Sequence, residues 1–186
     1  MMVRAGLPRD AASFISIGAG QNAVAALRRG EIDAMVSVDP VINLLESEGA
    51  IKIVADTRTV EGTRQVYGGL YPAAVLYLTP AYAQSNPAAT QSLVNAFVRG
   101  LKWVAKQSPE EIAKVMPEQY MLGNKELYIR SIKSSIPMYS PDGRFGHEGP
   151  EIALKVLREF DPDVRRATID LAKTYTEDFV SKVPAR

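Results

Sequence analysis

A glycine-bracketed turn, Gly18-Ala19-Gly20, is the first stretch of the sequence whose residue types could bind a ligand. It leads directly into a helix-like segment that begins at Gln21 and Asn22. Glycines let a backbone approach a ligand closely, and the N–H groups at the start of a helix can hold an anion. The alternative is that the glycines only permit a tight turn from a strand into a helix, because Gly-x-Gly alone is a weak signal.

Asp39 closes an apolar run about 20 residues later, and Ser37 is one of the few polar residues in that run. Asp39 could accept a hydrogen bond from a ligand amine, or it could only cap the helix that Pro40 begins. A glycine turn followed by an acid at this distance also occurs in dinucleotide-binding enzymes. Pro40 opposes that interpretation, because it commits Asp39 to the start of a helix.

Few other side chains are of the types that form metal, catalytic or ligand-binding sites. His147 is the only histidine and the chain has no cysteine, so we expect no metal site, no catalytic residues and no cofactor. Tyr67, Tyr71 and Tyr77 flank an apolar segment. Tyrosines often line small-ligand clefts, although packing in a core or an interface is the commoner reason for such a pattern. We count Tyr71 among the candidate ligand-binding residues.

The composition excludes some classes of function. Lys and Arg total 22 against 21 Asp and Glu, so the net charge is +1, which gives nucleic-acid binding no electrostatic support. The longest apolar stretches, such as residues 72–78, are too short to span a bilayer. Residues 1–7 lack the apolar core of a signal peptide and resemble the end of a helix, so we expect the chain to be a fragment.

The apolar patterns predict the elements that would position these side chains. Short apolar or β-branched runs predict strands at residues 12–17, 32–38, 51–55 and 70–79. Helical spacing and capping residues predict helices between the first three strands, at about 21–29 and 40–49. This β-α-β-α-β order predicts an α/β fold with a parallel-type sheet flanked by helices.

A long helix is predicted from about residue 85, and from Ser108 onward almost all signals are helical. Ser108 and Asn124 are candidate caps, and residues 148–160 have helical spacing. We therefore expect an α/β ligand-binding lobe over residues 1–107 and a mainly helical C-terminal segment over 108–186.

The stretch "FISIGAGQNAVAALRRGEIDAMVSVDP" resembles the second lobe of type II periplasmic substrate-binding proteins of ABC transporters. The most similar group (NMT1/THI5-like) comprises receptors for nitrate, sulfonates and taurine, with binders of thiamine-pyrimidine precursors. Its A-x-x-A-L-x-x-G-x-x-D-A pattern corresponds to Ala23, Ala26, Leu27, Gly30, Asp33 and Ala34. The later stretches "NPAATQSLVNAFVRGLKWVAKQSPEEIAK" and "IDLAKTYTEDFV" resemble the following helix pair and the C-terminal ending.

The resemblance implies a receptor in the periplasm, or lipid-anchored outside the cytoplasm, that closes two lobes over a small anionic or heterocyclic ligand. The ligand would be a sulfonate, nitrate, taurine or pyrimidine-like molecule, delivered to ABC permease subunits. The ligand contacts would come from the glycine turn with Gln21 and Asn22, and from Asp39. The first lobe would be absent, residues 108–186 would pack toward it, and the bare face would favour self-association of the fragment. The alternatives are an enzyme on the same fold, of the pyrimidine-synthesis or menaquinone-pathway kind, and a sensor lobe fused to a regulator.

Overall fold

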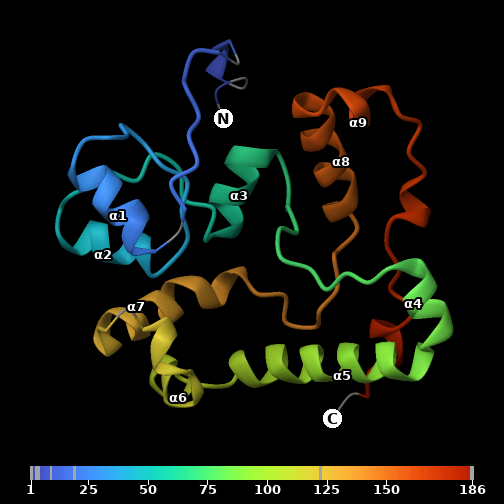
Figure 1. The fold of residues 1–186 in the computed structure, drawn as a ribbon. Helices are drawn as coiled ribbons and strands as arrows, with labels where there is room; N and C mark the ends of the chain where they lie inside the picture. The colour runs from blue at the N-terminus through green and yellow to red at the C-terminus, as the bar shows by residue number, and fades with distance from the viewer. Residues whose placement is uncertain (1, 3–4, 9, 19, 122, 185–186) are drawn as a thin grey trace. The chain divides into compact units, whose positions relative to one another are not determined.

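The computed structural model describes residues 2, 5–8, 10–18, 20–121 and 123–184, which form helices joined by turns and extended segments (Figure 1). The α-helices are α1 (Gln21–Arg28), α2 (Val41–Ser47), α3 (Val60–Tyr67), α4 (Pro80–Ser85), α5 (Pro87–Val104), α6 (Pro109–Val115), α7 (Lys125–Ser135), α8 (Gly149–Phe160) and α9 (Pro162–Arg166). Short 3-10 helices are η2 (Glu118–Tyr120), η3 (Ile136–Met138), η4 (Leu171–Lys173) and η5 (Val180–Lys182). No described helix is long and apolar enough to cross a membrane.

The predicted parallel sheet is wrong, because none of the described residues forms a β-strand. The segments predicted as strands are extended or bent, and many of their apolar side chains lie in solvent. Phe14 is 80% exposed, Val38 73% and Val54 85%. A strand is stable only when a neighbouring strand pairs with its backbone N–H and C=O groups. A β-branched composition favours a strand but does not supply that neighbour.

The chain divides into two compact units. Unit 1 comprises Met1–Ala55 and Pro109–Ser135, and unit 2 comprises Asp56–Ser108 and Ile136–Arg186. Each unit therefore combines two separate stretches of the sequence. The predicted division into residues 1–107 and 108–186 stays a prediction.

The core of unit 1 lies between α1 and α2. Val24 of α1 is 1% exposed, and Val41 and Leu45 of α2 are 4% and 0% exposed. Partly buried apolar side chains pack around them: Leu27, Met35, Leu44 and Ile51. Val24 and Leu27 therefore both lie on the face of α1 that packs into this cluster. Burying each of these aliphatic side chains contributes roughly 1.5–3 kcal/mol, so this small cluster holds α1 and α2 against each other.

In unit 2 the long helix α5 packs against η5 and α4, and α8 packs against α9 (Figure 1). Val98 of α5 is 3% exposed. The helix predicted over residues 148–160 is confirmed as α8, which ends at Phe160, and α9 begins two residues later at Pro162. The Asp161 side chain accepts hydrogen bonds from the N–H groups of Asp163 and Val164, at 2.8 and 3.2 Å, and so starts the new helix.

Candidate functional site

The glycine turn has the backbone conformation that only glycine adopts without strain. Gly18 has φ of 72° and Gly20 has φ of 63°. Gly20 is the N-cap of α1, and no side chain caps the first turn of that helix. The exposed residues Gln21 and Asn22 begin the helix. The turn therefore leaves the first backbone N–H groups of α1 without a side-chain cap, and the predicted ligand contact at this position stays a prediction. Ala19, the remaining predicted contact of the turn, lies outside the described residues.

Asp39 is half-buried and lies just before α2 in the chain. The peptide bond that joins it to Pro40 is cis. Its Oδ1 atom accepts hydrogen bonds from Asn43 twice, from the backbone N–H at 3.1 Å and from Nδ2 at 2.6 Å. Its Oδ2 atom accepts a hydrogen bond from Ser135 Oγ at 3.4 Å. Both oxygens of the carboxylate are thus oriented by groups from two helices, α2 and α7.

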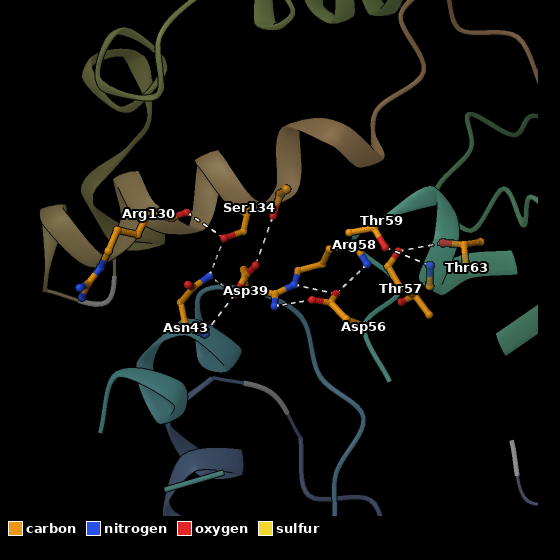
Figure 2. A network of polar contacts seen from close by, with 11 residues as sticks. Asp39, Asn43, Asp56, Thr57, Arg58, Thr59, Thr63, Arg130 and Ser134 are labelled. Atoms are coloured by element: carbon orange, nitrogen blue, oxygen red, sulfur yellow. Dashed lines mark hydrogen bonds and ion pairs between the residues drawn. The ribbon is translucent and has the colours of Figure 1, made fainter. Parts of the chain in front are cut away.

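The end of α7 completes this polar cluster. Figure 2 shows Asp39 between Asn43 of α2 and Ser134 of α7. Asn43 Nδ2 also donates a long hydrogen bond of 3.5 Å to Ser134 Oγ, and that hydroxyl donates to the carbonyl of Arg130 at 3.2 Å. We call Asp39, Asn43, Ser134 and Ser135 the Asp39 cluster. The sequence analysis found only the first member.

The other predicted contacts are distributed over both units. Ser37 lies half-buried in the extended segment that leads to Asp39 in unit 1. Tyr71 belongs to unit 2, where its ring stacks on that of Tyr67 with centroids 4.4 Å apart and planes 21° from parallel. The structure therefore places the glycine turn, Ser37 and Asp39 in one compact unit, and it gives Tyr71 a packing partner in the other.

His147 lines a hollow of about 490 Å3 in unit 2, together with Arg144, Gly146, Ala172, Tyr175, Thr176 and Glu177. The Glu177 carboxylate is engaged by its neighbours, because it accepts hydrogen bonds from Arg144 Nη1 at 2.8 Å and from the Phe145 N–H at 3.3 Å. This carboxylate holds two loops together rather than orienting an imidazole for proton transfer. Among the described residues no group of three His, Asp or Glu side chains could hold a metal ion.

A second carboxylate with a distinctive environment is Asp56, directly before α3. Arg58 donates to it from Nε at 2.9 Å, from Nη2 at 2.8 Å and from its backbone N–H at 2.9 Å. The Arg58 side chain is only 12% exposed. The hydrogen bonds from Arg58 lower the pKa of Asp56 below its ordinary value, so this ion pair persists into acid. We infer that the ion pair between Asp56 and Arg58 fixes the backbone conformation of the residues that lead into α3.

The comparisons with known proteins agree with the resemblance in the N-terminal part of the chain. Residues 4–117 match the model of the NMT1-like family. A solved structure of a protein from Bordetella bronchiseptica RB50 is 42% identical in sequence, with a TM-score of 0.89. That match covers 97% of this chain and 57% of the Bordetella chain, so this chain spans a little over half the length of that relative. None of the curated proteins matches this chain.

Proposed function

Because this chain belongs to the NMT1-like family, we propose that it forms part of a solute-binding protein of the nitrate and sulfonate type. Proteins of this family bind small ligands and work with ABC transporters. We propose that the ligand is a sulfonate, nitrate, taurine or a pyrimidine-like molecule, and that it is passed to ABC permease subunits outside the cytoplasm. The protein would bind and release its ligand without breaking a bond in it.

The Asp39 cluster carries this proposal. Holding a carboxylate by hydrogen bonds to both oxygens fixes its direction before a ligand arrives, which lowers the ordering cost of binding. The glycine turn of the same unit offers backbone N–H donors, which suit an anionic group. A ligand with a sulfonate at one end and an amine at the other, such as taurine, would use both kinds of group. These features support an amine-bearing anion as the first ligand to test.

We further propose that a second lobe closes over this ligand. Closure of two lobes requires that the ligand binds the closed form more tightly than the open form. The Bordetella relative is longer than the matched region, so its remaining chain provides a natural template for such a lobe. Catalysis is the weaker proposal, because Glu177, which lines the same hollow as His147, is engaged by Arg144 and by the Phe145 N–H.

Titration calorimetry with taurine, an alkanesulfonate, nitrate and a pyrimidine precursor would test this function. We expect at least one of them to bind, and to raise the melting temperature of the protein by mass action. Asp39→Ala should weaken the binding of an amine-bearing ligand tenfold or more, because the ligand would lose its acceptor. Asp39→Asn separates charge from hydrogen bonding, since it keeps one acceptor oxygen.

Asp33→Ala is the matched control, because Asp33 is an exposed acid in the same unit. Binding by this variant should equal that of the unchanged protein. If no member of the panel binds, the receptor function is contradicted. If Asp39→Ala and Asp33→Ala both bind the ligand with the affinity of the unchanged protein, the receptor function is retained. Asp39 would then act only at the start of α2 and would not contact the ligand.

A further inference from the structure

The hollow of unit 2 that His147 lines is formed by two loops, one directly before α8 and the other around and after η4. Its volume of about 490 Å3 lies within the range of about 300–1,000 Å3 that small-molecule sites occupy. Both loops belong to the same compact unit, so the walls of the hollow are a property of that unit alone.

Polar and aromatic contacts join the two loops to each other. Arg144 of the first loop donates a hydrogen bond to Glu177 of the second at 2.8 Å. The ring of Tyr175 stands edge-on to the ring of Phe145, with centroids 5.5 Å apart and planes at 77°. A site whose walls are ordered before the ligand arrives loses less conformational freedom on binding.

Three side chains that line the hollow have hydrogen-bonding capacity left for a ligand. Within the described part of the chain, neither the imidazole of His147 nor the hydroxyl of Tyr175 makes a hydrogen bond. The Thr176 hydroxyl accepts a hydrogen bond from the Asp178 N–H at 3.1 Å, which leaves its O–H to donate. Because hydroxyl groups both donate and accept, these side chains suit a ligand whose own groups do both.

The acid and the arginine of the lining offset each other. Arg144 and Glu177 form an ion pair, and the second oxygen of the Glu177 carboxylate accepts a hydrogen bond from the Phe145 N–H at 3.3 Å. A charged ligand would lose hydration here without meeting an unpaired opposite charge, which costs free energy. Tyr175 is 39% exposed, so part of its ring is open to the C–H groups of a ligand. The hollow therefore suits a neutral ligand.

We propose that this hollow binds a single neutral sugar ring, that is, a monosaccharide. The hydroxyls of a sugar donate and accept hydrogen bonds, as the free groups of His147, Tyr175 and Thr176 require. One face of a sugar ring carries C–H groups that can pack on the Tyr175 ring, and the molecule brings no charge. The proposal does not depend on the ligand proposed for the Asp39 cluster, whose residues all belong to unit 1.

Saturation-transfer NMR of the full chain with glucose, galactose, mannose and ribose, followed by titration calorimetry, tests the proposal. We expect at least one of these sugars to bind with a dissociation constant on the order of 1 mM, because a few exposed hydrogen bonds each contribute little net free energy. Methanesulfonate and nitrate serve as anionic probes. Neither should displace the sugar, because the arginine of the hollow is already paired with Glu177.

His147→Ala and Tyr175→Phe should each weaken sugar binding roughly threefold to tenfold, because each removes one hydrogen-bonding group. Ala172→Phe should weaken it at least tenfold, because it fills the hollow without removing a polar group. Tyr77→Phe is the matched control for Tyr175→Phe, since Tyr77 is 86% exposed in the same unit and does not line the hollow. It should leave binding unchanged. Circular dichroism checks that each variant is folded, and the remaining variants decide the result if one is not.

Four results would overturn the hollow as a sugar site. The first is that none of the four sugars binds, and the second is that methanesulfonate or nitrate displaces the sugar. The third is a Tyr77→Phe variant that binds as weakly as Tyr175→Phe, which would indicate unspecific contact with exposed tyrosines. The fourth is sugar binding that Asp39→Ala removes and His147→Ala leaves unchanged, which would place the sugar in unit 1.

Discussion

At the scale of single residues, Asp39 shows how one carboxylate can join parts of the chain that are distant in sequence. It begins α2 through the backbone N–H of Asn43, and it reaches α7 through Ser135. A residue that only caps its own helix needs the first contact and not the second. The second contact therefore distinguishes Asp39 from an ordinary helix start.

Two glycines inside helices predict opposite effects of the same substitution. A Cβ atom on Gly62 of α3 would lie 1.7 Å from the carbonyl oxygen of Asp56, whereas a Cβ atom on Gly100 of α5 would meet nothing within 4 Å. Gly62→Ala should lower the free energy of unfolding by about 2–3 kcal/mol, because backbone must move. Gly100→Ala should raise it by about 0.5–1 kcal/mol, because alanine is the better helix former.

Urea denaturation measures the free energy of unfolding of both glycine variants. Equal effects of the two substitutions would contradict the placement of α3 against the Asp56 carbonyl.

At the scale of elements, the start of α3 depends on an acid that is sensitive to pH. Arg58 lowers the pKa of Asp56 in the folded state, chiefly by side-chain hydrogen bonding, from an ordinary value of 3.8. A lowered pKa gives stability that is present above that value and is lost as the pH falls through the lower, folded-state pKa. Asp56→Asn should therefore destabilise the protein at neutral pH, and the difference from the unchanged protein should shrink below about pH 4.

Urea midpoints measured from neutral pH down to acid would show this convergence. Asp163→Asn serves as the control, because Asp163 pairs with Arg166 on the surface at 89% side-chain exposure, where an ion pair contributes little. A difference between Asp56→Asn and the unchanged protein that stays constant with pH would contradict the role of this ion pair.

The sequence was sufficient to predict most helices, because their signals are local. Asn86-Pro87 and Asn124 lie at the starts of α5 and α7, as expected for a long helix from about residue 85 and for a capping asparagine. The helix α3 was not predicted, since its segment is polar. Its signals were present all the same: Thr59 accepts a hydrogen bond from the Gly62 N–H at 3.0 Å, and Gly68 ends the helix with φ of 87°.

The sheet and most of the Asp39 cluster could not be predicted in the same way. Strands depend on neighbours elsewhere in the chain, and an apolar run such as residues 32–38 carries no information about whether a neighbour is present. Asn43 was within reach of sequence reasoning, because it lies one helical turn after Asp39. Ser134 and Ser135 were not, since only the packing of α7 against α2 brings them to Asp39.

At the scale of the whole molecule, the absence of paired strands among the described residues predicts uneven protection of the backbone. Amides in residues 32–38 and 51–55 should exchange with solvent on the order of a hundredfold faster than those inside α1 and α2, because only the helices hold their N–H groups in regular hydrogen bonds. Hydrogen-exchange mass spectrometry measures both classes in one experiment. Protection of residues 32–38 equal to that of α2 would contradict the structure.

Because unit 1 combines two separate stretches of the sequence, its first stretch leaves the ribosome well before the second stretch has been translated. Asp39 precedes Ser135 by 96 residues, and Asn43 precedes Ser134 by 91. At roughly 5–20 residues per second, a ribosome releases α7 about 5–20 seconds after α2. During that interval the carboxylate of Asp39 lacks its hydrogen bond from Ser135, and the surface of α2 that α7 later covers is open to chaperones. Unit 1 can therefore finish folding only when α7 has been translated, long after the residues of α2 that α7 contacts.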